Sequence, residues 1–318
     1  MAVYTQVSAE SLSRFLADYD VGDLVSAKGI AEGVENSNYL VGTTRGRFIL
    51  TLYEKRVDAD DLPFFMALLD HLAAKGLPVP PAIKDRHGVE IKQLEGRPAC
   101  LIKFLTGVSL GHPIAAQAHA AAAAMGAMHA ALADFERQRP NTMGVDGWRG
   151  LLERCGRDLD GIDPGMFDQL ARALDTVEAG WPRALPTSAI HADLFPDNVL
   201  MLGDEVTGLI DFYFACTDIR AYDLAVMHTA WSFDGEGHNH DVAVGRALLA
   251  GYRTALALSD EEHAALPILA QGSCIRFALT RAWDWLNTPA DAMVTRKDPL
   301  AYTRRLAFYQ DGGRRVFG

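Results

Sequence analysis

Hydrophobic residues in the first hundred positions come mostly in short runs that end at glycine-containing turns, a pattern typical of β-strands. One segment differs, because over 60–75 apolar residues recur every three or four positions and stop before Gly76, which predicts a helix. A shorter helix is expected over 8–17, where Ser8 offers an N-cap. The expected strands lie at 25–30, 38–41, 47–53, 82–83, 89–94 and 97–105. Strands grouped around one helix predict a small α+β domain.

From position 113 onward the apolar spacing becomes mainly helical. The expected helices lie at 114–135, 148–159, 166–179, 222–231, 242–257, 261–285 and 299–309. One island of strands interrupts them, at 188–190, 199–202 and 206–211. The Ala-rich run 120–124 indicates a helix packed closely against a neighbour, and His129 in the same helix is expected to be buried and bonded to the backbone.

This change of pattern divides the chain into two predicted lobes of an α+β protein. The N-terminal lobe, 1–105, holds an antiparallel sheet, and the larger C-terminal lobe, 106–318, is mostly helical. Glycines and a proline in the segment 106–113 are typical of a hinge between the two.

Charge and cysteine content exclude several functions. The 318 residues carry 30 Lys and Arg against 41 Asp and Glu, a formal net charge of −11. Nucleic-acid binding and polybasic membrane anchoring both need clustered positive charge, so we expect neither. The four cysteines are too dispersed for a disulfide framework or a C-x-x-C metal site. Because the N-terminus also lacks a signal-peptide pattern, we expect a cytoplasmic protein.

The strongest chemical signal lies in the strand island. His191 and Asp193 precede Asn198, and after a short hairpin a hydrophobic residue, Asp211 and Phe follow. This order matches the loops that transfer phosphoryl groups, in which one carboxylate accepts the proton of the attacking hydroxyl while an amide and a second carboxylate hold Mg²⁺. We therefore predict Asp193 as the catalytic carboxylate and Asn198 and Asp211 as metal ligands. His191 is expected to brace the loop, and Asp197 to cap it or form an ion pair.

A glycine-containing turn joins the first two predicted strands. Gly33 permits close approach to a ligand, and backbone N–H groups near Ser37 are suited to phosphate oxygens. The sequence contains no Gly-Lys-Ser/Thr phosphate-binding loop. The turn therefore fits a cover over nucleotide phosphates of the protein-kinase type.

These motifs identify a resemblance to the aminoglycoside phosphotransferase/choline kinase superfamily, which has a protein-kinase-like two-lobed fold. More narrowly, the chain resembles the homoserine kinases of that superfamily. The similarity extends over nearly the whole chain and is carried by Gly29–Tyr39, Phe48–Glu54, Asp61–Phe65, Ile210–Cys216 and Ala221–Ala225.

The resemblance implies ATP and Mg²⁺ as cofactors and L-homoserine as the acceptor, giving O-phospho-L-homoserine for threonine biosynthesis. It implies nucleotide contacts from the N-terminal lobe, at Gly33, Asn36, Ser37, Asn38, Ile30, Ile102 and Phe104. Asp223 is implied as an acid that steadies the catalytic loop. One position departs from the pattern, because Thr51 stands where many relatives place a phosphate-binding Lys or Arg, and Lys55 lies past the strand end.

An acceptor that is a zwitterion needs a cation for its carboxylate and an acid or carbonyl group for its ammonium. The substrate candidates are Tyr213, Tyr222, Trp231, Arg276 and Arg281. The two arginines are five positions apart on one predicted helix and cannot both face one ligand squarely, so one is expected in a surface ion pair. Choline, an amino sugar or another amino alcohol remain alternative acceptors.

Three alternatives belong to other classes of protein. Ser109 lies in a Gly-x-Ser-x-Gly sequence and, with an aspartate and His228, follows the chain order of a serine hydrolase. The segment 234–241 contains His and acidic residues suited to a metal. A kinase-shaped binding module without activity is a third possibility, although it retains Asp193, Asn198 and Asp211.

Overall fold

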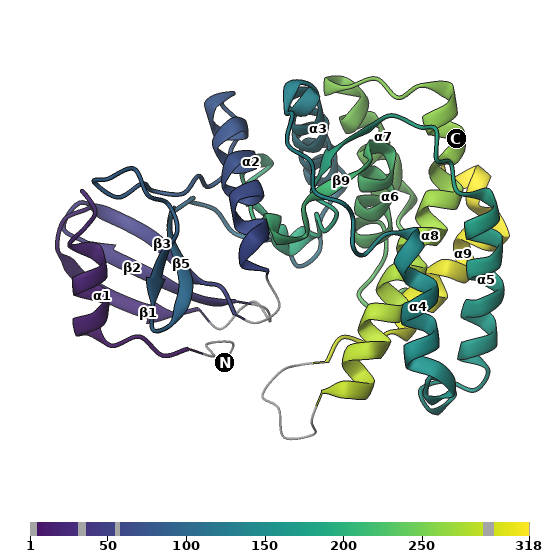
Figure 1. Cartoon of the computed structure of the whole chain (residues 1–318). Coiled ribbons are helices and arrows are strands. Elements are labelled where there is room, and N and C mark those ends of the chain that lie inside the picture. Colours follow the sequence, from purple (N-terminus) through teal and green to yellow (C-terminus); the bar gives the residue numbers. More distant parts are fainter. Residues whose placement is uncertain (1–4, 31–35, 55–57, 289–295, 318) are drawn as a thin grey trace. The chain divides into compact units, whose positions relative to one another are not determined.

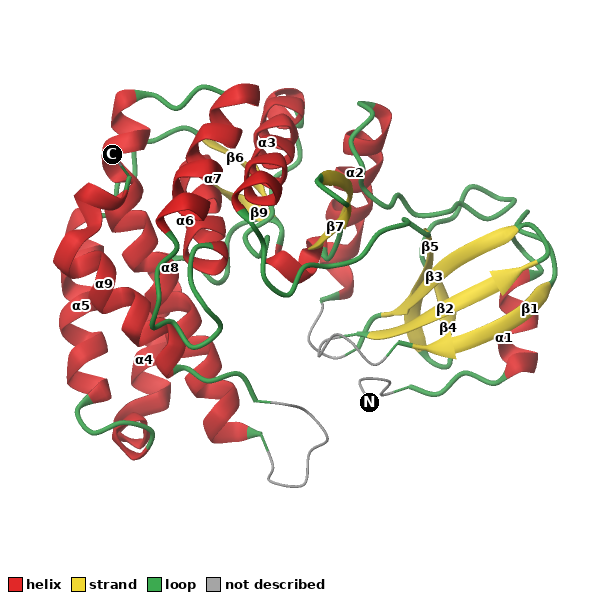
Figure 2. Ribbon diagram, turned by 180° about the vertical axis from the view of Figure 1, so that it is seen from behind, coloured by secondary structure: helices red, strands yellow, loops and turns green. Residues whose placement is uncertain are grey.

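In the computed structural model, which describes residues 5–30, 36–54, 58–288 and 296–317, the chain divides after Thr106 into two units (Figure 1). A five-stranded antiparallel sheet forms the body of the first unit, and helices form most of the second (Figure 2). The α+β fold class predicted from the sequence, with an antiparallel sheet in the N-terminal part and helices in most of the remainder, is therefore confirmed.

The sheet of the first unit has the order β1-β2-β3-β5-β4. Its strands are β1 (Leu24–Gly29), β2 (Ser37–Thr43), β3 (Gly46–Leu52), β4 (Lys92–Leu94) and β5 (Arg97–Lys103). Helix α1 (Ala9–Leu16), with Ser8 as its N-cap, buries Leu12 and Phe15 in a core shared with Val41 and Leu50 of the sheet. Helix α2 (Leu62–Ala74) follows a 3-10 turn, Ala59–Asp61.

Two predicted strands of this unit are wrong in extent. The segment 82–83 forms only an isolated bridge between Ala82 and Ile102, and the strand expected over 89–94 is reduced to Lys92–Leu94. At 85–89 the backbone turns instead, because the Asp85 carboxylate accepts the N–H groups of His87 and Val89.

The second unit holds two short antiparallel pairs, one of β6 (Thr187–Ile190) with β9 (Cys216–Ile219) and one of β7 (Val199–Leu202) with β8 (Glu205–Leu209). Strand β9 was not predicted, since its four residues, Cys216–Ile219, lack a distinctive pattern and gain strand geometry by pairing with β6. The helices are α3 (Ala115–Ala131), α4 (Val145–Cys155), α5 (Met166–Gly180), α6 (Arg220–Trp231), α7 (Val242–Ala255), α8 (Asp260–Asn287) and α9 (Leu300–Val316).

Helix α6 is the centre of the second unit. Every residue from Ala221 to Trp231 is buried, and α8 packs along it. Helix α8 begins at a capping box of Ser259 and Glu262, and the buried Glu262 carboxylate also pairs with Arg220 at the start of α6. This arrangement ties α6, which carries Asp223, to the helical core.

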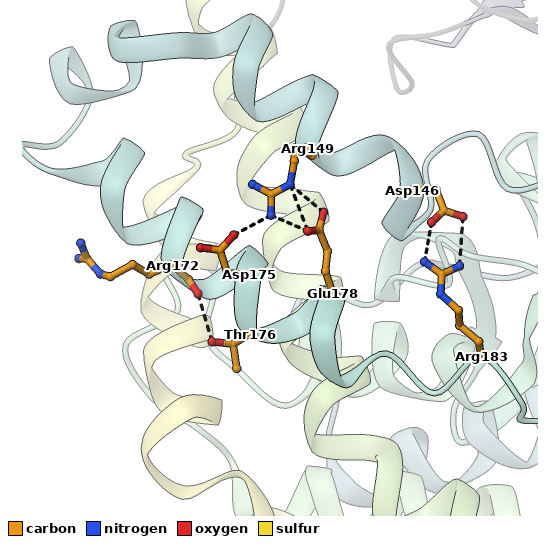
Figure 3. Close-up of polar contacts among 7 residues, drawn as sticks. All are labelled: Asp146, Arg149, Arg172, Asp175, Thr176, Glu178 and Arg183. Atoms are coloured by element: carbon orange, nitrogen blue, oxygen red, sulfur yellow. Dashed lines mark hydrogen bonds and ion pairs between the residues drawn. The ribbon is translucent and has the colours of Figure 1, made fainter.

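Ion pairs on the surface link α4 to α5 and to Arg183, which follows α5 in the chain (Figure 3). The Arg149 guanidinium donates to both oxygens of Glu178 and to Asp175, and Arg183 forms a two-bond contact with Asp146. Because most of these side chains are exposed to solvent, the pairs contribute little to stability. No helix among the described residues is long and apolar enough to cross a membrane.

Candidate active site

The loop after β6 takes its shape from a single buried carboxylate. Both oxygens of Asp223 accept backbone N–H groups, one from His191 and one from Ala192, at 2.8 Å each. Ala192 has a φ of 63°, a left-handed conformation that a residue with a side chain adopts only at a cost. The two hydrogen bonds from α6 therefore hold a strained turn that presents the next residue, Asp193.

Asp223 is itself held by a histidine. His129 on α3 contacts Asp223 Oδ2 through Nε2 at 3.1 Å and Tyr252 Oη through Nδ1 at 2.8 Å. Burial acts to raise the pKa of Asp223, but the hydrogen bonds and electrostatic effects of His129 and His191 together outweigh it and lower that pKa overall. The expectation that backbone groups satisfy His129 is wrong, because its partners are two side chains from α6 and α7.

Asp193 and Asn198 are connected directly. Asn198, which is buried, donates from Nδ2 to the backbone oxygen of Asp193 at 2.8 Å and lies 3.5 Å from its Oδ2. Burial raises the pKa of Asp193 to about 8, an effect that the Arg276 guanidinium opposes and the Asp211 carboxylate increases. An aspartate with so high a pKa lies in a place that requires further positive charge to be ionised.

Asp211 reaches the same region from the end of β8. The Ile210 N–H donates to the Asn198 carbonyl at 3.0 Å, and the Ile210 carbonyl accepts His191 Nε2 at 2.9 Å. Asp211 follows with a φ of 65°. Although its side chain remains accessible to water, the surrounding protein limits its hydration and raises its pKa to about 6, and Asp197 increases the shift.

The donors at this place fit a magnesium ion. Mg²⁺ takes oxygen ligands and commonly uses one or two protein groups, completing its shell with phosphate oxygens and water. The amide nitrogen of Asn198 is committed to Asp193, which leaves its carboxamide oxygen for a ligand, and Asp211 offers carboxylate oxygens from the chain after β8. Within the described ranges no three His, Cys, Asp or Glu side chains are grouped to hold a metal by themselves. A bound ion would therefore need oxygens from a ligand.

A hollow of about 820 Å³ opens beside the catalytic loop, entirely within the second unit. Phe195 and Asp197 of the loop line it, together with Trp231 at the end of α6. Two guanidinium groups, Arg281 of α8 and Arg305 of α9, also line it. Arg305 belongs to no recognisable motif, so the sequence analysis missed it. Only the tertiary structure places its side chain at the hollow.

The other predicted substrate residues lie elsewhere. Arg276 is 2% exposed and donates to the Ala192 carbonyl at 2.5 Å. It therefore stabilises the His191–Asn198 loop from the protein interior. Tyr222 is fully buried and packs against Trp148 and Trp181, which makes it a core residue rather than a substrate contact. Tyr213 is half-buried in the turn after Asp211 and donates its N–H to that carboxylate.

The expectation that one of the two arginines of α8 forms a surface ion pair is wrong. Neither Arg276 nor Arg281 pairs with an acidic side chain in the part of the chain that the structure describes. Arg276 is buried, and Arg281 donates from Nη1 to the Asp298 carbonyl at 3.2 Å.

In the first unit, four of the predicted nucleotide contacts, Ile30, Asn36, Ser37 and Asn38, lie at one end of the sheet, whereas Ile102 and Phe104 lie toward the other end, where β5 pairs with the start of β3. The registers Ser37–Leu52 and Leu52–Ala99 place the start of β2, the end of β3 and the start of β5 together. Ser37 is fully buried, and its hydroxyl donates to Glu54 Oε1 at 2.8 Å. Asn36 is also buried and accepts the Glu54 N–H through its side chain at 3.3 Å. Gly33 and Lys55 lie outside the described residues.

Some atoms of the remaining predicted nucleotide-contact residues are already bonded to, or packed against, other protein groups. Asn38 accepts the hydroxyl of Thr51 at 2.8 Å. Ile30 follows β1 with its N–H bonded to the Asn38 carbonyl. Ile102 is buried on β5, whereas Phe104 is half-buried with the Arg47 guanidinium 4.4 Å from its ring centre.

A cation that sequence reasoning missed lies at this end of the sheet. Arg97, the first residue of β5, contacts Glu54 Oε2 through Nε at 3.2 Å. Thr51, at the position where a cation was sought, is 1% exposed and bonded to Asn38. No motif marks Arg97, because its place follows from strand pairing alone.

The two alternative chemistries find no support in the geometry. Ser109 is exposed on a loop, while His228 is buried with its Nδ1 at 2.6 Å from Tyr309 Oη, so no serine–histidine pair forms. In the segment 234–241 the Asp234 carboxylate accepts N–H groups from His238 and Asn239, as in an ordinary capped turn.

The phosphotransferase enzyme family model matches residues 26–270. Three curated relatives carry the name homoserine kinase. The protein of Nitrobacter winogradskyi is 53% identical over 100% of this chain and 98% of its own, that of Zymomonas mobilis 51% over 100% of both, and that of Rhizobium etli 50% over 98% and 97%.

Solved structures share the fold at low identity. An amicoumacin kinase in complex with AMP-PNP, Ca²⁺ and amicoumacin is 14% identical with a TM-score of 0.70, covering 95% of this chain and 93% of its own. A microcompartment-associated aminopropanol kinase is 20% identical with a TM-score of 0.66, covering 98% and 99%.

Proposed function

The chain belongs to the phosphotransferase enzyme family, and from that premise we propose that it is a homoserine kinase, which transfers the γ-phosphoryl group of ATP to the hydroxyl of L-homoserine. The observation that carries the proposal is the match to homoserine kinases at 50–53% identity over nearly the full length of both chains. Such coverage includes both units and the whole catalytic loop.

Asp193 is the residue that we propose to accept the proton of the substrate hydroxyl. As the hydroxyl oxygen bonds to the γ-phosphorus, the bond to the β-phosphate oxygen breaks, ADP leaves, and the proton moves to the Asp193 carboxylate. The chain holds this carboxylate through Asp223, which fixes the turn, and through Arg276, which holds the Ala192 carbonyl. Positioning of this kind supplies much of the rate in phosphoryl transfer.

We propose that Asn198 and Asp211 hold Mg²⁺, which neutralises charge on the triphosphate. The raised pKa values of Asp193 and Asp211 support a bound cation, because positive charge nearby stabilises both ionised carboxylates. His191 fixes the spacing of the two ligands, since its Nε2 holds the carbonyl directly before Asp211.

For the nucleotide we propose contacts from Ile30, Gly33 and Asn36, and from Ile102 of β5 and Phe104, which follows that strand. Because the hydroxyl of Ser37 and the side-chain oxygen of Asn38 are bonded within the unit, these residues would offer other atoms to ATP. Arg97 is our candidate for the phosphate-binding cation that position 51 lacks, since it is only partly buried.

The test is release of ADP from Mg·ATP with L-homoserine, compared with choline, 3-amino-1-propanol and kanamycin. Asp193→Asn should lower kcat by about a thousandfold, because it removes the proton acceptor and little volume. Asp204→Asn, in the exposed turn between β7 and β8, serves as the control. Turnover with another acceptor and not with L-homoserine would overturn the proposed substrate, and an unchanged kcat in Asp193→Asn would overturn the role of Asp193.

A further inference from the structure

The hollow beside the catalytic loop contains an unusual pair of positive charges. Arg281 and Arg305 come from different helices, α8 and α9, and both stand over the ring of Tyr302, with their guanidinium carbons 4.5 and 4.4 Å from its centre. Neither guanidinium is paired with a carboxylate among the described residues. Two adjacent unpaired cations lining one hollow are costly unless an anion enters it.

Each guanidinium retains donors for such an anion. Arg305 is 3% exposed; its two terminal nitrogens donate to the Thr229 and Asp234 carbonyls, and its buried Nε has no partner. Arg281 makes a single hydrogen bond within the described residues, to the Asp298 carbonyl. A guanidinium has five N–H donors, so carbonyl contacts of this kind orient the groups without exhausting them. Burial lowers the pKa of Arg281, and the neighbouring Arg305 charge acts in the same direction.

Negative charge in the hollow is arranged differently. Asp234 is bonded within its own turn, and Asp241 caps α7 by accepting the N–H groups of Ala243 and Val244. Asp197 also lines the hollow, and its carboxylate has neither a hydrogen bond nor an ion pair within the described segments. The sequence-based expectation that Asp197 caps the loop or forms an ion pair is therefore wrong. It remains a negative group next to the catalytic turn.

We propose that this hollow is a receptor for the zwitterionic end of an α-amino acid, with Arg281 and Arg305 binding the carboxylate and Asp197 binding the ammonium group. The inference rests on the proposed function and makes it more specific, because it states why an amino acid is accepted and a simple amino alcohol is not. Phe195 and Asp197, which line the hollow, follow Asp193 in the same loop, so the carboxylate proposed to receive the hydroxyl proton lies next to the proposed receptor.

The receptor accounts for discrimination between acceptors. Choline, 3-amino-1-propanol and amino sugars bring a cation and no carboxylate, so the two guanidinium groups would stay unpaired and repel them. A site built to bond a substrate group rejects an analogue without that group by large factors. L-Homoserine and 3-amino-1-propanol differ only by the carboxylate, which makes them a matched pair for the experiment.

The experiment measures kcat and KM for L-homoserine, 3-amino-1-propanol and 4-hydroxybutanoate, the last of which lacks the ammonium group. Arg281→Met should lower kcat/KM for L-homoserine about 100-fold, mainly through KM, and leave 3-amino-1-propanol within about threefold of the wild type. Arg305→Lys should act in the same direction with a smaller loss. Asp197→Asn should penalise both amines more than it penalises 4-hydroxybutanoate.

Arg246→Met is the control, because Arg246 is exposed on α7 and its loss removes the same charge from the helix that borders the hollow. Far-UV circular dichroism checks folding, and Arg281→Lys replaces Arg281→Met if the latter does not fold. Titration calorimetry with L-homoserine alone gives a readout that does not depend on turnover, and binding should weaken in the Arg281 variant.

The outcomes separate the two proposals. If the wild type uses L-homoserine and Arg281→Met loses L-homoserine and 3-amino-1-propanol equally, the receptor is overturned while the proposed function stands. If the wild type prefers 3-amino-1-propanol or choline to L-homoserine, the proposed function fails, and the receptor fails with it.

Discussion

Strain and buried charge concentrate on a few residues of the candidate site. Ala192 and Asp211 both have left-handed backbone conformations, and each adjoins a hydrogen bond that holds it there. Asp193, between the strained turn and Asn198, has a pKa raised to about 8 by burial. Groups held in this way cost stability and are retained where chemistry needs them.

Stability should therefore depend on pH through Asp193. Its pKa is near 3.8 when exposed and about 8 in the folded protein, so the folded state binds the proton more tightly, and its contribution to stability is present below pH 4 and lost as the pH rises through 8. At low pH the Asp193→Asn variant should have the same free energy of unfolding as the wild type. As the pH rises toward 8, the wild type should lose stability and the variant should become the more stable of the two. Urea denaturation at pH 5 and 8 measures the difference, with Asp204→Asn as the control. A constant difference would show that the ionisation of Asp193 is not the cause.

At the scale of elements, the close approach of α3 and α7 supports the catalytic loop through His129. Each of the two helices has a glycine where the backbone of the other comes close. On α7, a Cβ at Gly251 would lie 2.1 Å from the His119 carbonyl oxygen. On α3 itself, a Cβ at Gly126 would lie 2.7 Å from the Tyr252 carbonyl oxygen. The prediction from the alanine run that a neighbouring helix packs closely is confirmed.

Gly251→Ala should destabilise the protein by about 2–3 kcal/mol, because the added methyl group meets backbone that cannot rotate away. Gly150→Ala is the matched control, since Gly150 also lies inside a helix but a Cβ there meets nothing within 4 Å. The control should gain about 0.5–1 kcal/mol from the better helix propensity of Ala. Guanidinium denaturation of both variants provides the measurement, and an equal effect of the two substitutions would refute the packing argument.

At the scale of the whole molecule, ligand binding should be linked to folding. The proposed ligands Asn198 and Asp211 flank the β7–β8 hairpin, and pairing of its two strands holds them at one place only in the folded chain. Negative charge at Asp193, Asp197 and Asp211 gathers at one place, and the electrostatic repulsion among these groups is relieved when a cation binds.

Magnesium with AMP-PNP should therefore stabilise the protein by about 2.7 kcal/mol when the free ligand is at 100 times its Kd. Chelation with EDTA should remove most of this gain, and Asp211→Asn should show little response to the metal. Thermal unfolding with and without each component tests this expectation. Full stabilisation of Asp211→Asn by Mg·AMP-PNP would place the metal elsewhere.

The order and spacing of residues were sufficient to predict the two-part α+β organisation and the loop from His191 to Asn198. The His191–Asn198 loop is local in sequence, so its residue types at fixed spacing are enough to predict it. Regular apolar spacing predicts the helices in the same way. The sequence could not place Arg305 beside Arg281 or Arg97 beside Glu54, since each contact joins elements far apart in the chain. It also could not show that Tyr222 is core and Arg276 a brace.

Burial, partner and pKa are properties of the folded neighbourhood. For that reason only the tertiary structure decided which charges remain unpaired in the hollow.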